Sequence, residues 1–89
     1  FTAAANNVLL FVSTVAGDAD SVAASRTFMT ANSTYTDTAA TFYAIVTDTN
    51  SSALYEITGD AGADEFVGDT IALMGTVDAV LVAADVLFA

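Results

Sequence analysis

The chain consists of short apolar runs separated by polar breaks, and the spacing of apolar residues within each run predicts its structure. The first run, NVLLFVSTV at residues 7–15, is continuous and rich in β-branched residues. Continuous apolar runs of this length are typical of strands covered on both faces, whereas half-exposed strands alternate apolar and polar positions. The run therefore predicts a strand, and we expect it at the centre of a sheet.

A helical spacing follows the break at residues 17 and 18. In DSVAASRTFMTA, at residues 20–31, Ala24, Phe28 and Ala31 recur at intervals of four and three, which places them on one helical face. Asp20 or Ser21 can act as the N-cap, because either side chain can accept a hydrogen bond from a backbone N–H of the first turn. The pattern predicts a short helix that packs on the sheet.

The middle of the chain has the pattern of a β-hairpin. TFYAIVTD, at residues 41–48, and ALYEIT, at residues 53–58, are aromatic and β-branched runs, and the Asn and Ser residues between them favour a turn. We expect the two runs to pair antiparallel. Alternation in the second run predicts that Tyr55 and Ile57 face the core. The opposite face is expected to be wet, and it carries Leu54, Glu56 and Thr58.

The last third of the chain adds one more strand candidate and an apolar end. A glycine- and acid-rich stretch at residues 59–69 leads into TIALMGTV at residues 70–77, and an apolar run occupies residues 81–89. The order strand, helix, hairpin, strand predicts a single α+β domain over residues 1–89. We expect a small, mainly antiparallel sheet of about four or five strands with one short helix packed on it.

Charged residues are almost all acidic. Nine Asp and two Glu face a single cation, Arg26, for a net charge of -10, and the chain has no Cys, His or Lys. Without a basic patch it cannot displace counterions from nucleic acid or bind an anionic membrane, so both are poor partners. Glu56 with Asp48 or Glu65 is the one carboxylate pairing suited to glycosidase chemistry. Because the other groups of acid–base and nucleophilic catalysis are missing, we expect no enzymatic activity.

The composition favours an extracellular or cell-surface location. Ala, Thr, Val, Ser and Asn are abundant and Lys is absent, which is typical of exported surface-layer or matrix proteins. The apolar N-terminal stretch is interrupted by four polar residues and falls short of the roughly 20 apolar residues of a membrane span. A first residue Phe1 in place of Met favours a processed piece of a longer precursor.

Carboxylates gather in positions that suit a hard cation. Calcium takes six to eight oxygen ligands, and no His or Cys is present to favour zinc. The best candidate ligands lie in the acidic stretch: Asp60, Asp64, Glu65 and Asp69. Weaker candidates with alternate spacing are Asp18, Asp20, Asp48 and Asn50. The alternative is that these carboxylates are turn residues and caps exposed to water.

Three stretches together resemble a known group of exported proteins. FYAIVTDTNSSALYEI, DTIALMGTV and VAADVLFA resemble the C-terminal regions of proteins exported by type I secretion, including calcium-binding repeat adhesins and surface-layer proteins. The resemblance covers residues 41–89. It implies that the end of the chain is an uncleaved export signal recognised by a type I secretion apparatus. The signal would comprise Ala83, Ala84, Asp85, Val86, Leu87 and Phe88.

Two functions from different classes fit these features. The first is a self-assembling extracellular subunit of a filament, layer or matrix, in which an apolar segment adds to the sheet of a neighbouring copy. The residues expected at such contacts are Val8, Leu9, Leu10, Phe11, Val12, Leu81, Val82, Val86, Leu87 and Phe88. The second is a monomeric secretion-signal or binding module that calcium stabilises outside the cell.

Overall fold

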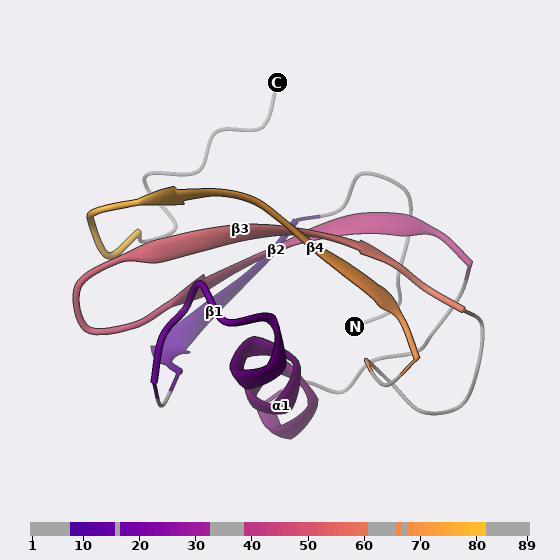
Figure 1. Cartoon of the computed structure of the whole chain (residues 1–89), viewed down its shortest axis with the longest axis horizontal. Coiled ribbons are helices and arrows are strands. Elements are labelled where there is room, and N and C mark those ends of the chain that lie inside the picture. The colour runs from indigo at the N-terminus through magenta and orange to yellow at the C-terminus, as the bar shows by residue number, and fades with distance from the viewer. Residues whose placement is uncertain (1–7, 16, 33–38, 61–65, 67, 82–89) are drawn as a thin grey trace.

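A computed structural model describes residues 8–15, 17–32, 39–60, 66 and 68–81, with the side chains of residues 12 and 13 excepted. Within these residues the chain forms four strands and one helix (Figure 1). Their bounds are β1 Val8–Thr14, α1 Val22–Asn32, β2 Thr41–Thr47, β3 Ser52–Thr58 and β4 Thr70–Val77. The predicted α+β class, with one short helix and a mainly antiparallel sheet, is confirmed.

The four strands form one sheet in the order β1, β2, β3, β4. The pairs β2–β3 and β3–β4 are antiparallel, whereas β1 and β2 are parallel. A parallel pair needs a crossover, and α1 supplies it. The central position expected for the first strand is therefore wrong, since β1 lies at an edge of the described sheet. A continuous apolar run indicates that both faces of a strand are buried. It does not indicate whether the strand has a neighbouring strand on each side.

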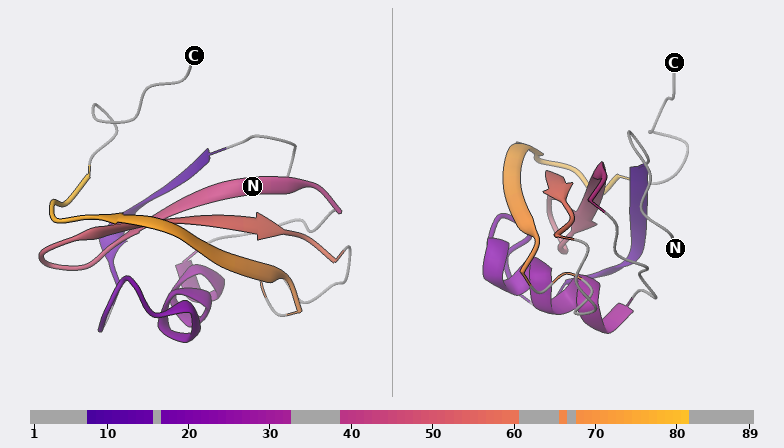
Figure 2. Two further views of the ribbon diagram at one scale, coloured as in Figure 1. Left: turned by 45° about the horizontal axis from the view of Figure 1, so that its top comes forward. Right: turned by 90° about the vertical axis from the view of Figure 1, so that its right-hand side faces the viewer.

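The core lies between α1 and one face of the sheet (Figure 2). The helix contributes Met29, which is fully buried, and Phe28, whose ring meets that of Phe11 edge-on at 5.4 Å. Tyr55 and Ile57 are fully buried in this core, as the alternation in β3 predicts. In β2, Ala44 lies opposite Tyr55 and Phe42 opposite Ile57, and both are buried, as is Val46 opposite Ala53.

Helix α1 has one of its predicted N-cap residues, but its buried face differs from the predicted one. Ser21 is the N-cap, because its Oγ accepts a hydrogen bond from the Ala24 N–H at 3.2 Å. The buried helical residues are Ser25 and Met29, while Ala24 and Phe28 flank them and pack against the core. Ala31 is exposed, contrary to its predicted place on the buried face. It follows Met29 by two residues, which is more than half a helical turn.

A buried polar contact fixes the helix to the sheet. The Tyr55 hydroxyl donates a hydrogen bond to the Ala19 carbonyl, and Ser25 Oγ lies 3.1 Å from that carbonyl and 3.3 Å from the hydroxyl. Burial raises the pKa of Tyr55, the contact with Ser25 opposes this, and the charges of two nearby aspartates add to the rise. The contact joins β3, α1 and the segment that precedes the helix.

Candidate functional site

Asp48 is a structural residue of the β2–β3 turn. Its Oδ1 accepts hydrogen bonds from the Asn50 and Ser51 N–H groups, both at 2.8 Å. Its Oδ2 accepts from the Ala19 N–H and from Ser51 Oγ, both at 3.0 Å. These bonds, led by those from the backbone of Asn50 and Ala19, hold the pKa of Asp48 at about 2, below its usual 3.8. The carboxylate predicted as a calcium ligand therefore closes a turn and fastens it to the segment before α1.

Other acidic side chains lie near Asp48 at this end of the sheet. Asp18 Oδ1 accepts a hydrogen bond from the Asp20 N–H at 2.9 Å. Partial desolvation, and then the charges of Asp18, Asp48 and Asp78, raise the pKa of Asp20. Within the described part of the chain, no three His, Cys, Asp or Glu side chains come close enough together to hold a metal ion. Calcium binding stays a prediction.

The acidic stretch before β4 is closed by its first and last aspartates. The Asp60 N–H donates to Asp69 Oδ1 at 3.2 Å, and the Arg26 guanidinium donates to the Asp69 carbonyl at 2.9 Å. Gly68 has a positive φ of 85°, and a Cβ there would collide with the Asp60 carboxylate. The structure thus brings together two of the predicted calcium ligands. The other two, Asp64 and Glu65, lie outside the described residues.

The carboxylate pair considered for glycosidase chemistry does not meet. Tyr43 is the β2 residue opposite Glu56, and Asp48 follows it by five residues along the chain. At about 3.3 Å per residue, Asp48 and Glu56 are separated by roughly 16 Å along the strand direction, beyond the roughly 5–9.5 Å of catalytic carboxylate pairs. The possible partner Glu65 lies outside the described residues. The geometry gives no support to the pairing of Asp48 with Glu56.

Strand β4 forms an exposed apolar edge of the described sheet. Every residue from 72 to 80 is exposed, including Leu73, Met74 at 55% and Val77 at 48%. The strand contains no charged residue and no Pro. Its pairing with β3 passes from Leu73 directly to Gly75, so Met74 is an extra residue at a β-bulge. An edge of this kind presents unpaired backbone groups to another strand.

Sequence reasoning did not select β4 as a contact strand. Of the residues predicted for assembly, Leu9 and Phe11 face the core, while Val8 and Leu10 are half-buried. These residues belong to β1 at the opposite edge, where the side chain of Val12 is not described. Leu81, the next residue predicted for assembly, is half-buried and lies after β4. Residues 82–89, which hold the predicted export signal and the other predicted contact residues, lie outside the described part of the chain. The sequence of β4 is a run of eight residues without charge, which by itself does not distinguish an edge strand from a central one.

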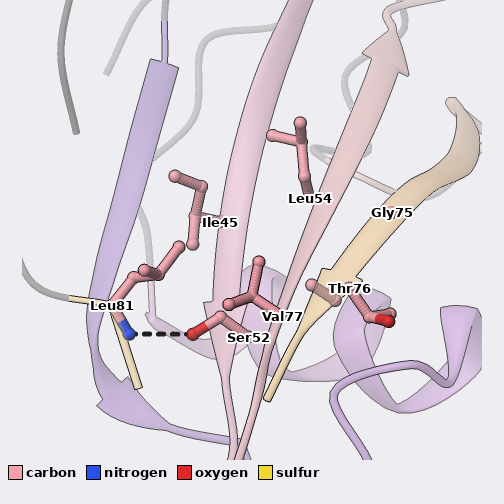
Figure 3. A pocket seen from close by; sticks show the side chains of 8 residues that line it. Ile45, Ser52, Leu54, Gly75, Thr76, Val77 and Leu81 are labelled. Atoms are coloured by element: carbon pink, nitrogen blue, oxygen red, sulfur yellow. Dashed lines mark hydrogen bonds between the residues drawn. The ribbon is translucent and has the colours of Figure 1, made fainter. Parts of the chain in front are cut away.

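The sheet face opposite α1 contains a hollow of about 230 Å³ (Figure 3). Leu81 and Ile45 lie on one side of it, and Gly75 and Thr76 on the other, with Leu54 between them (Figure 3). Leu54 is 38% exposed, as the alternation in β3 predicts. The full lining is Ile45, Ser52, Ala53, Leu54, Gly75, Thr76, Val77 and Leu81. The hollow is apolar apart from the hydroxyls of Ser52 and Thr76.

Comparisons with known proteins add no family to this geometry. No protein-family model, no curated protein and no solved structure matches the chain. Within the described residues, no helix has the length and apolar character needed to cross a membrane. The two surface features available for a functional interpretation are therefore the β4 edge and the hollow on the open face of the sheet.

Proposed function

We propose that the chain is a non-enzymatic extracellular subunit that assembles with copies of itself by adding strands at the edge of its sheet. The observation that carries this proposal is β4, an eight-residue edge strand without charge or Pro whose side chains are largely exposed. Soluble proteins usually protect such an edge with Lys, Pro, inward-pointing charges or a covering element. Here the β-bulge at Met74 is the one protective feature within the strand.

The opposite edge of the described sheet supplies a partner for β4. Strand β1 is also free of charged residues, and its main chain pairs with β2 on one side. Pairing β4 of one copy with β1 of the next is a heterologous contact, which repeats without closing unless the rotation forms a ring. Assembly of this kind therefore produces an extended polymer with a continuous sheet.

Net charge sets the conditions for assembly. Each copy carries a charge of -10, so copies repel one another at low ionic strength. Salt shortens the range of this repulsion to about 10 Å at 0.1 M. Divalent cations such as calcium reduce the repulsion further by binding carboxylates. We therefore expect assembly to strengthen with ionic strength and more steeply with calcium.

The test compares two substitutions that change charge equally at different places. Met74→Lys puts a cation on the β4 edge, and Ala31→Lys puts one on the exposed end of α1, where a cation also suits the helix dipole. Electron microscopy and light scattering in millimolar calcium should show polymers for the unmodified chain and for Ala31→Lys. Met74→Lys should remain monomeric while keeping the far-UV circular dichroism spectrum and melting temperature of the folded chain. Polymers from Met74→Lys, or their loss in both variants, would contradict a contact at β4.

One observation favours the second function, a monomeric module stabilised by calcium. The pKa of Asp20 is raised by partial desolvation and by neighbouring carboxylates, and a bound cation would relieve that repulsion. The same samples distinguish this function from assembly. A chain that stays monomeric in calcium and after chelation, and whose melting temperature rises in calcium but not in sodium at equal ionic strength, would support the second function.

A further inference from the structure

The open face of the sheet is an uncovered apolar surface with room for another segment. Leu54 and Val77 are large apolar residues that stand exposed on it, and Ile45 and Leu81 line the hollow beside them (Figure 3). A Cβ placed on Gly75 would meet nothing within 4 Å, so space remains above β4 as well. Exposed apolar patches of this kind favour contact with a protein segment.

Ser52 directs the end of the described chain toward this hollow. Its Oγ donates a hydrogen bond to the Ala79 carbonyl at 2.7 Å and accepts one from the Leu81 N–H at 2.9 Å. Because Ser52 is the first residue of β3, these bonds hold the chain against the end of the hairpin after it leaves β4. The Leu81 side chain lies in the hollow on the side of Ile45 (Figure 3).

The residues that continue from Leu81 suit the hollow in chemistry and length. Their sequence is VAADVLFA, which has one charged residue, Asp85, among seven apolar ones. Eight extended residues reach about 26 Å, whereas four strands spaced by about 4.8 Å extend over about 14 Å. The segment is therefore long enough to cross the whole face from its starting point in the hollow.

We propose that the hollow is the binding site for the chain's own C-terminal run, residues 82–89. The chain's own segment is favoured over that of a second copy, because it continues directly from a residue that already lines the hollow. A covalent connection this short gives an effective concentration in the millimolar range or above, without a separate association step. The proposal gives the apolar C-terminus a role in covering the sheet and leaves assembly to the β4 and β1 edges.

A pair of introduced cysteines tests the proposal, and the absence of native Cys makes the result unambiguous. Leu54→Cys is combined with Val86→Cys in one variant and with Leu87→Cys in another, because adjacent residues of an extended segment point to opposite sides. Ala23→Cys, exposed on α1 behind the sheet, replaces Leu54→Cys in the matched controls. Mild oxidation of dilute protein should give a monomeric internal disulfide at least about tenfold faster with Leu54→Cys than with Ala23→Cys.

Mixing chains that carry one cysteine each identifies the source of the bound segment. Leu54→Cys chains mixed with Val86→Cys or Leu87→Cys chains should give no more cross-linked dimer than the Ala23→Cys mixtures. A specific excess of dimer would show that a second copy fills the hollow, and this would overturn the proposal. Equal rates for the Leu54→Cys and Ala23→Cys double variants would overturn it as well. Because β4 is unchanged in these variants, the result does not depend on whether the chain polymerises.

Discussion

Replacing Ser52 with Ala is expected to loosen the segment that follows β4 by a calculable amount. The Oγ atom makes two hydrogen bonds to the main chain, at Ala79 and Leu81, and the side chain is 1% exposed. A hydrogen bond contributes about 0.5–1.5 kcal/mol net, so removal of both bonds should lower the free energy of unfolding by at most about 1–3 kcal/mol. Ala79 is exposed, and its carbonyl can bind water after the substitution. We therefore expect the free energy of unfolding to fall by about 1–2 kcal/mol.

Ser51→Ala is the matched control for this measurement. It removes the neighbouring hydroxyl, which donates one bond to Asp48, but the Asp48 carboxylate keeps its three backbone donors. The expected loss is below about 1 kcal/mol. Urea unfolding followed by circular dichroism, at concentrations where light scattering shows monomers, gives both values. Each kcal/mol also lowers the melting temperature by ~4–8 °C for a domain of this size.

Hydrogen exchange gives a local measure of the same substitution. The Leu81 amide should exchange slowly in the unmodified chain and much faster in Ser52→Ala, because its acceptor is gone. A loss below about 0.5 kcal/mol for Ser52→Ala, or an equal loss for Ser51→Ala, would refute this account of the hydrogen bonds. Unchanged exchange at Leu81 would refute the role of Ser52 in directing the chain.

Two further predictions concern acid stability and glycine conformation. Asp48 has its pKa lowered from 3.8 to about 2, so the stability it confers is complete above pH 3.8 and is lost as the pH falls through about 2. In Asp48→Asn, the free energy of unfolding should therefore change less with pH across this window. A pH dependence equal to that of the unmodified chain would contradict the assignment. Gly68→Ala should cost more stability than Gly17→Ala, because both have positive φ but only Gly68 would place a Cβ against the Asp60 carboxylate; urea unfolding should separate them by more than about 1 kcal/mol, and equal losses would show that Asp60 moves aside freely.

Local patterns in the sequence were sufficient to predict most elements and their faces. Alternation in β3 predicts the buried Tyr55 and Ile57 and the exposed Leu54, because side chains on a strand must point to opposite faces. The helix was predicted at the right place, but its buried stripe centres on Ser25 and Met29. Ser25 is a polar residue whose burial depends on a contact with Tyr55, 30 residues away. A hydropathy pattern does not contain that information.

The order of strands and the candidate sites depend on contacts between distant parts of the chain. A strand is at an edge because it has no neighbour on one side. The sequence of residues 70–77 alone therefore does not show whether this strand lies at an edge or at the centre of a sheet. The same limit applies to Asp48, which an acidic pattern presents as a ligand. One of its hydrogen-bond donors is Ala19, 29 residues away, and this contact makes the carboxylate part of the fold. Spacing alone therefore does not distinguish a structural carboxylate from a metal ligand, and the structure was needed to assign Asp48.

The turn of the β2–β3 hairpin links the fold to the proposed assembly. Asp48 fastens the segment before α1 through the Ala19 N–H, and Ser52 fastens the segment after β4 through Ala79 and Leu81. Both attachments are made at the end of the hairpin, along the direction of the strands. Backbone pairing between copies would proceed across the strands, at right angles to this direction. The hairpin can therefore hold both flanking segments without occupying the outer sides of β1 and β4, which is where the described sheet can accept a further strand.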